Sequence, residues 1–282
     1  MVYPTEPPSE YEVNSEPLHE QPLLLEILFV RHGFSCANAW QYRKGLFPLY
    51  SDPELTKNGI DKCIERSNVL KEKIHIYFPD DKYKIGTSCM IRTQQTAYYM
   101  LMENTDLKYS IFPHIAEQGR GYDNFPFAQE KQKEFINKLN SDITPRIEYD
   151  ARGITDASHK SNWDMFLTWI NTMSDMERSK FFHKTEKGVY RAVVFTHGHF
   201  INHNLNLENV QNNDVIFTRI DAANKKILVR EKLTEFSFPK ELKSDVSSCR
   251  IKSAFALLNP YGGKTRRRVQ RKNRKQRTYK RK

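Results

Sequence analysis

Residues 27–38, with the sequence ILFVRHGFSCAN, carry the strongest indication of the fold in this chain of 282 residues. Residues 27–30 form a short apolar run of β-forming side chains, which is typical of a buried strand. Arg31, His32 and Gly33 follow the run directly, and the polar residues after them are suited to begin a helix. Open α/β sheets bind ligands beyond the carboxyl ends of parallel strands, so we expect His32 to lie at a ligand site. A strand-end histidine alone more often has a structural role, and other segments must decide between the two.

A second histidine has the same setting. Residues 191–196 are apolar and β-branched, and His197 and Gly198 follow them as His32 and Gly33 follow the first run. The two histidines are 165 positions apart, and they come together only if both strands end at one edge of a parallel sheet. The sequence therefore predicts a crevice that both imidazoles share.

An arginine follows a third strand-like segment, residues 83–87. Arg92 stands near the start of an expected helix. Its planar guanidinium group can donate two parallel charge-assisted hydrogen bonds to phosphate oxygens. A solvated helix arginine is the alternative for this residue alone, but beside two histidines Arg92 indicates a phosphate site.

The order of the segments predicts the fold class. Strand-like runs alternate with longer helical segments, which favours a three-layer α/β/α fold with a mostly parallel sheet and helices on both faces. The predicted strands are residues 26–30, 83–87, 109–113 and 191–196, a hairpin is expected from 214–220 and 226–230, and the predicted helices are 56–73, 92–102, 127–139 and 162–182.

Together these segments resemble the histidine phosphatase superfamily, which is phosphoglycerate mutase-like in fold. Residues 31–38 are similar to its Arg-His-Gly-x-Ser-x-x-Asn motif, and residues 88–96 to its Ser-x-x-x-Arg-x-x-Gln-Thr segment. Residues 55–59 match Leu-Thr-x-x-Gly, and residues 115–117 match Leu-x-Glu with isoleucine in place of leucine. The resemblance covers about residues 25 to 230 and is weakest between 120 and 190. It implies a phosphoglycerate mutase-like fold in which the last two predicted helices form a cap over the active-site edge.

The resemblance also implies a role for each motif residue. His32 would be the nucleophile that is phosphorylated transiently, His197 the second active-site histidine and Glu117 the general acid. The substrate phosphoryl group would be bound by Arg31, Asn38 and Arg92. The loop after Glu117 departs from the family's Gly-x-x-Glu-Gly form, so Asp123 is an alternative acid. The scheme requires no cofactor and no metal.

The expected activity is metal-independent hydrolysis of a phosphomonoester, either a phosphorylated small molecule or a phosphoprotein. A mutase is less favoured, because residues 120–190 show no pocket for a carboxylated sugar acid. The alternative from another class is a phosphate- or phosphoprotein-binding module with weak or no catalysis, tethered to nucleic acid by the basic residues 264–282. His199 and His203 are compatible with a metal cluster, but surface or helix-packing histidines are the favoured interpretation, since no carboxylate or cysteine stands at ligand spacing.

The two ends of the chain differ from its middle. Residues 1–22 contain five glutamates and no lysine or arginine, which predicts a disordered acidic arm before a catalytic domain of residues 23–260. Residues 264–282 contain twelve lysines and arginines and no acid, so the rest of the chain accounts for −1 of the net charge of +11. A basic run of this kind predicts a disordered tail, residues 261–282, that binds nucleic acid or serves as a nuclear signal. A solubilising tail without a partner is the alternative.

Location is predicted from the cysteines and from the apolar runs. Cys36, Cys63, Cys89 and Cys249 show no metal or framework spacing, which favours free thiols in the reducing cytoplasm or nucleus. There is no signal-peptide pattern, and the apolar run of residues 23–30 is far shorter than the roughly 20 residues of a membrane span. We therefore expect no membrane association. The junction at residues 261–264 is similar to tails of proteins from large nucleocytoplasmic DNA viruses. From this similarity we expect only that the chain comes from such a virus.

Overall fold

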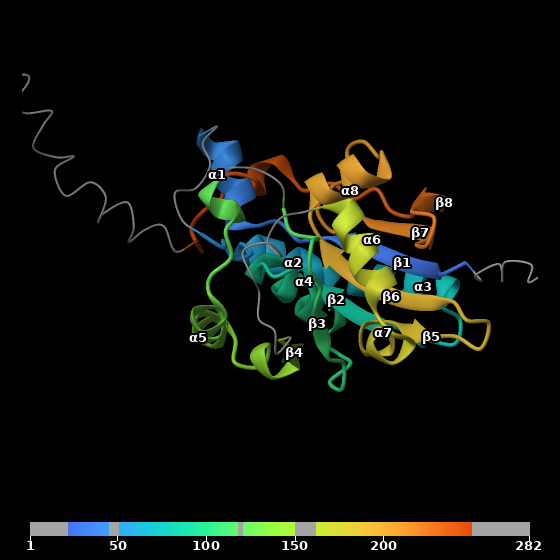
Figure 1. Cartoon of the computed structure of the whole chain (residues 1–282). Coiled ribbons are helices and arrows are strands. Elements are labelled where there is room, and N and C mark those ends of the chain that lie inside the picture. The colour runs from blue at the N-terminus through green and yellow to red at the C-terminus, as the bar shows by residue number, and fades with distance from the viewer. Residues whose placement is uncertain (1–21, 45–50, 118–120, 150–161, 250–282) are drawn as a thin grey trace, which may run out of the picture.

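The computed structural model describes residues 22–44, 51–117, 121–149 and 162–249 (Figure 1). The predicted acidic arm, apart from Pro22, and the predicted basic tail lie outside the described residues. Within the described ranges no helix is long and apolar enough to cross a membrane.

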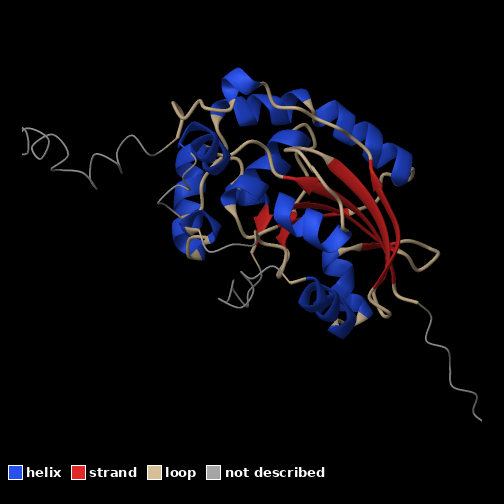
Figure 2. Cartoon of the chain, turned by 90° about the horizontal axis from the view of Figure 1, so that it is seen from above, coloured by secondary structure: helices blue, strands red, loops and turns tan. Residues whose placement is uncertain are grey.

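A mixed sheet forms the middle of three layers (Figure 2), and the three-layer prediction is confirmed. Its strands lie in the order β4-β3-β2-β6-β1-β7-β8. The first five are mutually parallel, β7 and β8 form the predicted antiparallel hairpin, and the short β5 pairs antiparallel with β6. The bounds are Leu24–Arg31 (β1), Lys84–Thr87 (β2), Tyr109–Ile111 (β3), Ile147–Glu148 (β4), His183–Lys184 (β5), Tyr190–Thr196 (β6), Val215–Asp221 (β7) and Lys226–Lys232 (β8).

The central strands are apolar on both faces because helices cover both faces. Along β1, Leu28 and Val30 belong to one apolar cluster, and Ile27 and Phe29 belong to the other. This division follows the two-residue period of a strand. A continuous apolar run is therefore what a strand in this position requires.

The helices divide between the two faces. Those that contribute to the first cluster are α2 (Lys57–Glu65), α3 (Ser67–Tyr77), α4 (Ile91–Leu101) and α5 (Gln129–Leu139). Those on the second are α6 (Trp163–Thr172), α7 (Asp175–Phe181) and α8 (Gly198–Leu205). Helix α1 (Cys36–Lys44) follows β1 at the edge where the parallel strands end, and 3₁₀ turns span Tyr122–Asn124, Thr144–Arg146 and Lys240–Leu242.

Two predicted helices are each divided in the structure. The helix expected over residues 56–73 breaks at Arg66, which is buried and donates to the carbonyl oxygens of Asn212 and Ser237 far along the chain. The helix expected over residues 162–182 ends before Ser174, which begins α7 with a capping box.

The predicted cap is wrong for α6 and α7. Phe166, Leu167 and Ile170 of α6 are fully buried against the sheet, so this helix covers a face rather than the active-site edge. The aromatic side chains of α6 are core residues, and Phe181 at the end of α7 packs against the same cluster.

The prediction of four free thiols is wrong for two of them. Cys36 and Cys249 form a disulfide bond between positions 213 residues apart in sequence. The chain after β8 returns to α1, a path that cysteine spacing cannot reveal. Cys63 and Cys89 are free and buried, and burial raises the pKa of each thiol to about 12. Two of the four cysteines therefore no longer support the predicted reducing compartment.

Candidate active site

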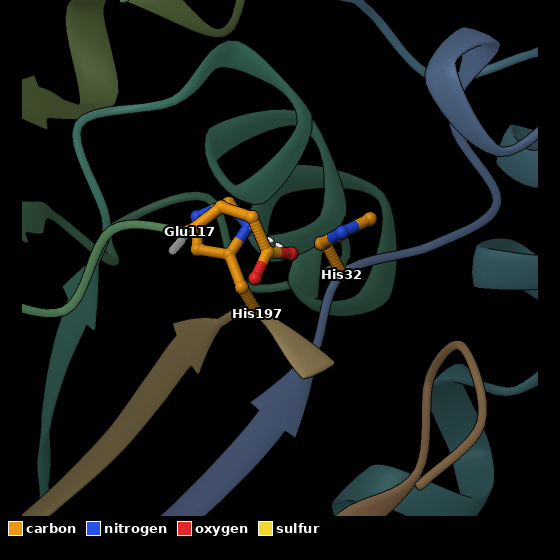
Figure 3. Close-up of side chains that lie close together, drawn as sticks. All are labelled: His32, Glu117 and His197. Atoms are coloured by element: carbon orange, nitrogen blue, oxygen red, sulfur yellow. Dashed lines mark ion pairs between the residues drawn. The ribbon is translucent and has the colours of Figure 1, made fainter. Parts of the chain in front are cut away.

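The structure brings His32 and His197 together. Strands β1 and β6 are parallel neighbours, with Arg31 paired to Thr196, so the next residue of each strand stands at the same edge of the sheet. The backbone N–H of His32 donates to the carbonyl of Thr196 at 2.9 Å, and the ring centroids of the two histidines are 5.1 Å apart. Figure 3 shows both rings beside the Glu117 carboxylate. The predicted shared crevice is confirmed by this geometry.

The ring of His32 is held in one tautomer. Nδ1 lies 2.7 Å from the carbonyl oxygen of Gly33, and because a carbonyl only accepts, Nδ1 carries the proton. Nε2 is then unprotonated and has a free lone pair. Burial and the charges of Arg92 and Arg31 hold the pKa of His32 well below its ordinary value, so the ring is neutral. Such an imidazole can attack an electrophile.

Arg31 reaches the same place from the end of β1. Its guanidinium group donates to the carbonyl of Val210, and its Nε is buried without a hydrogen-bond partner in the part of the chain described. A Cβ at Gly198 would lie 2.6 Å from this Nε. Glycine at the start of α8 therefore makes room for the arginine. Burial lowers the pKa of Arg31 from its usual value, and the Glu117 and Asp214 charges raise it.

Arg92 lies in the first turn of α4 and is almost fully buried. It donates to the carbonyl of Asp123 at 2.9 Å and to Oδ1 of Asn124 at 3.4 Å. Its Nε has no partner within the described ranges. Asp52 receives the backbone N–H of Ile91 at 2.8 Å and so fixes the start of the helix that carries Arg92. Two arginine side chains thus bring positive charge to one site, which suits an anion.

His197 lies between a hydroxyl and a carboxylate. Its Nε2 is 2.9 Å from Oγ of Ser88, and its Nδ1 is 3.6 Å from Oε2 of Glu117, just beyond hydrogen-bond distance. Burial, followed by the charge of Arg92, holds the pKa of His197 well below its ordinary value. The neutral ring can keep its proton on Nδ1, where it faces Glu117 and the space before His32.

A cavity of about 330 Å³ opens onto these groups. Asn38 lines it, and its Oδ1 accepts from the backbone N–H and hydroxyl of Ser35, which leaves the amide N–H₂ of Asn38 available to a ligand. Asn212 donates to the carbonyl of His32 at 2.8 Å and so holds the loop that carries His32. The described residues that line the cavity are Arg31, His32, Ser35, Ala37, Asn38, Gln41, Arg92, Glu117, Asp123, Asn124, Gly198, His199 and Asn202.

Five of the six predicted site residues line this cavity, and the ring of the sixth, His197, contacts the ring of His32. Asp123, the alternative acid, also lines it, and burial raises the pKa of its carboxyl group. His199 lines the cavity from α8, while His203 is exposed one turn further on and stacks on it.

One ligand atom from each of His32, Glu117 and His197 lies within 4.8 Å of the others, which is compatible with a metal ion. Because these residues adjoin Arg31 and Arg92, an anion is the better electrostatic match for the same space.

The supporting residues escape sequence analysis. Asp52, Ser88 and Asn212 act through hydrogen bonds to residues far along the chain, and no spacing or periodicity marks Asp52 or Asn212. Only Ser88 carries a signal, since it opens the segment that contains Arg92.

No family model matches the chain, and no curated protein matches it in sequence. Among solved structures, the chain is similar to a phosphoglycerate mutase from Bacillus anthracis str. Sterne, with 17% identity, a TM-score of 0.40 and coverage of 79% of this chain and 96% of that chain. It is similar to Bacillus stearothermophilus YhfR, with 11% identity, a TM-score of 0.41 and coverage of 77% and 98%. It is also similar to the putative phosphohistidine phosphatase SixA from Agrobacterium tumefaciens, with 8% identity, a TM-score of 0.38 and coverage of 73% and 96%. At these values the argument for function rests on the geometry of the site.

Proposed function

We propose that the chain is a phosphohydrolase of the histidine phosphatase superfamily that acts on a phosphomonoester through a phosphohistidine. The observation that carries the proposal is the hydrogen bond between Nδ1 of His32 and the Gly33 carbonyl at 2.7 Å, which directs the lone pair of Nε2 away from the backbone. The neutral ring adjoins the cavity together with the buried Arg92 and the half-buried Arg31. A nucleophilic nitrogen and a binding site for an anion therefore meet at the same cavity.

In the first step, Nε2 of His32 forms a bond to phosphorus, and the bond from phosphorus to the ester oxygen breaks. Arg31, Arg92 and the amide of Asn38 donate hydrogen bonds to the phosphoryl oxygens. These donors stabilise the negative charge that spreads over the phosphoryl oxygens in the transition state. The Nδ1–H of His197 adds another donor. The departing alkoxide takes a proton from the carboxyl group of Glu117.

In the second step, water attacks the phosphorus of phospho-His32. The Glu117 carboxylate takes a proton from this water, the bond between nitrogen and phosphorus breaks, and inorganic phosphate leaves. The enzyme returns to its starting protonation state. This chain's own residues supply every group that the two steps use.

The test uses 4-nitrophenyl phosphate in the presence of EDTA. We expect hydrolysis to persist with the chelator and to fall by about 1,000-fold or more in His32→Ala, because that variant loses the covalent step. A ³²P-labelled substrate should label the wild type and not the variant. His75→Ala is the matched control, since His75 is exposed on α3 and pairs with Asp81. Loss of activity with EDTA, or normal rates in His32→Ala, contradicts the proposal.

The alternative is a phosphate-binding module with weak or no catalysis, tethered to nucleic acid by residues 264–282. It predicts saturable binding of inorganic phosphate that depends on Arg31 and Arg92, with no turnover and no labelling of His32. The same experiment therefore separates the two functions.

A further inference from the structure

The hydroxyl group of Ser88 is buried between the second histidine and the start of α4. Ser88 directly follows β2, and neither Ser88 nor His197 has any exposed surface. Oγ of Ser88 lies 2.9 Å from Nε2 of His197 and 3.4 Å from the backbone nitrogen of Met90. The proposed mechanism uses His197 and gives Ser88 no role, although the serine hydroxyl contacts a nitrogen of that ring.

The Met90 contact indicates which group donates in the hydrogen bond between Ser88 and His197. A backbone N–H only donates, so Oγ of Ser88 accepts from Met90 with one of its lone pairs. The hydroxyl group still has its own proton to donate, and Nε2 of His197 is the nitrogen acceptor that the described residues offer it. If Nε2 carried the ring proton instead, the hydroxyl proton would be buried without this partner, which is unfavourable.

The neighbouring thiol of Cys89 is a weak competitor for the hydroxyl proton. Burial raises the pKa of this thiol to about 12, so the thiol is protonated, and sulfur is a weak acceptor. Burial, followed by the charge of Arg92, holds the pKa of His197 well below its ordinary value, and the neutral ring therefore keeps one nitrogen lone pair. Nε2 accepts from Ser88 with this lone pair, and the ring proton lies on Nδ1.

The proton on Nδ1 faces the carboxyl group of Glu117 (Figure 3). Nδ1 and Oε2 are 3.6 Å apart, and a shift of about 0.5 Å brings them into the range of an N–H···O hydrogen bond. Because Nδ1 donates, Oε2 accepts, and the acid proton of the carboxyl group is left to Oε1. With the opposite tautomer, a proton on Oε2 would be donated to Nδ1 and held away from the leaving group.

We propose that Ser88 is a positioning residue for acid catalysis. Its hydroxyl group holds the ring proton of His197 on Nδ1, and this proton keeps Oε2 of Glu117 as an acceptor, so that Oε1 carries the proton that the leaving group takes. The serine fixes a tautomer and exchanges no proton during the reaction. The proposal rests on the proposed function, in which Glu117 is the general acid.

NMR of the full chain with ¹⁵N-labelled histidine reads the tautomer, because long-range ¹H–¹⁵N correlations distinguish a protonated ring nitrogen from an unprotonated one. The signals of His197 are those that disappear in His197→Gln. We expect the Nδ1–H form in the wild type and in Ser88→Thr, which keeps the hydroxyl group, and a mixture of both tautomers in Ser88→Ala. The ring of His32, which the Gly33 carbonyl holds, should stay in its Nδ1–H form in every protein and is the internal reference.

Kinetics with two leaving groups separate this role from a structural one. We expect Ser88→Ala to lose about 10-fold more kcat with propyl phosphate than with 4-nitrophenyl phosphate, because the alkoxide needs the proton that is misdirected. Ser88→Thr should restore most of the difference, and in a Glu117→Gln background Ser88→Ala should add none. Thr87→Val is the matched control, because Thr87 is equally buried and its hydroxyl has no hydrogen-bond partner in the described part of the chain.

Both readouts compare two signals or two substrates on one protein, so they do not depend on the fraction that is folded. An Nε2–H ring in the wild type, an unchanged tautomer in Ser88→Ala, or equal losses of kcat with the two esters would overturn the proposal. If such a result appears while His32 is still labelled by substrate, the proposed function stands and the role of Ser88 alone fails. If no ester is hydrolysed and His32 is not labelled, the proposed function fails and the role in acid catalysis fails with it.

Discussion

Burial sets the protonation state of both active-site imidazoles. Desolvation and the charges of Arg92 and Arg31 hold the pKa of His32 well below 6.5, and the same influences, together with His32 itself, hold the pKa of His197 there. An imidazole in an unfolded chain binds a proton near pH 6.5. The folded protein therefore keeps both rings neutral at pH values where the unfolded chain has begun to protonate them. Neutral imidazoles at the candidate site are obtained at the expense of stability in acid.

We expect the free energy of unfolding to fall as the pH is lowered below about 6.5. The unfolded chain then binds more protons than the folded chain, and each histidine lowers the free energy of unfolding by up to about 1.4 kcal/mol per pH unit. Above about pH 6.5 both rings are neutral in the folded and in the unfolded chain, so they no longer lower the free energy of unfolding. Urea unfolding at about pH 7.5, 6.5 and 5.5 measures the slope. The double variant His32→Gln, His197→Gln should have a shallower slope, and an unchanged slope would show that other groups cause it.

The contribution of Glu117 to kcat should increase with the basicity of the leaving group. Nitrophenolate departs with little help from an acid, whereas an alkoxide needs a proton. We therefore expect Glu117→Gln to lose at least about 10-fold more kcat with an alkyl phosphate than with 4-nitrophenyl phosphate. Asp123→Asn serves as the comparison, since its carboxyl group lines the same cavity. Equal losses on both substrates in Glu117→Gln would assign the acid role to Asp123.

Among the helices and strands, sequence predicts the features that strand and helix periodicity set. The run before His32 and the run before His197 are buried strands, and parallel pairing alone places the two residues together. The start of α2 is equally predictable, because Thr56 caps it by accepting from the N–H of Gly59. Most of the candidate site is therefore contained in short segments.

The rest depends on contacts between distant segments. The break at Arg66 arises because its guanidinium group bonds to carbonyls more than 140 residues away, and no local pattern announces it. Asp52 holds the first turn of α4 for the same reason. The disulfide between Cys36 and Cys249 requires the segment after β8 to return to α1. Sequence periodicity reports on one helix or strand at a time, whereas each of these features depends on contacts between two distant segments.

That returning segment is attached to the site by more than the disulfide. Phe238 stacks on Phe34 with ring centroids 4.1 Å apart, and Ser248 accepts the backbone N–H of Lys57 at 2.9 Å. We expect Cys249→Ser to lower the free energy of unfolding by about 2–4 kcal/mol, because the crosslink restricts the unfolded chain. Urea unfolding with and without dithiothreitol measures this. Cys36→Ser should have the same effect, Cys63→Ser serves as the free-thiol control, and equal stability with and without reductant would contradict the crosslink.

The two ends of the described chain leave the fold from different places. Strand β1 begins at Leu24, at the end of the strand opposite to His32, and Figure 1 shows this start of β1 on the side of the molecule away from α1. Cys249, the last described residue, is bonded to Cys36 at the start of α1, beside the cavity. The described part of the chain therefore ends beside the candidate site, before the twelve positive charges of residues 264–282 in the sequence. Their sequence lies outside the described residues, and their role is a proposal.

We expect deletion of residues 264–282 to leave turnover of 4-nitrophenyl phosphate almost unchanged, because every residue of the proposed mechanism lies before residue 198. Affinity for nucleic acid should fall with the deletion. In the intact protein it should decline steeply with salt, since engagement of about six of the twelve charges gives a slope of about −5 in a plot of log K against log salt concentration for duplex DNA. A tail of equal length with glutamine at the basic positions is the matched control for chain length, and fluorescence anisotropy with a labelled duplex measures all three proteins. Binding that persists after deletion, or that ignores salt, would place the nucleic-acid site on the folded domain, while loss of turnover would show that the tail contributes to the active site.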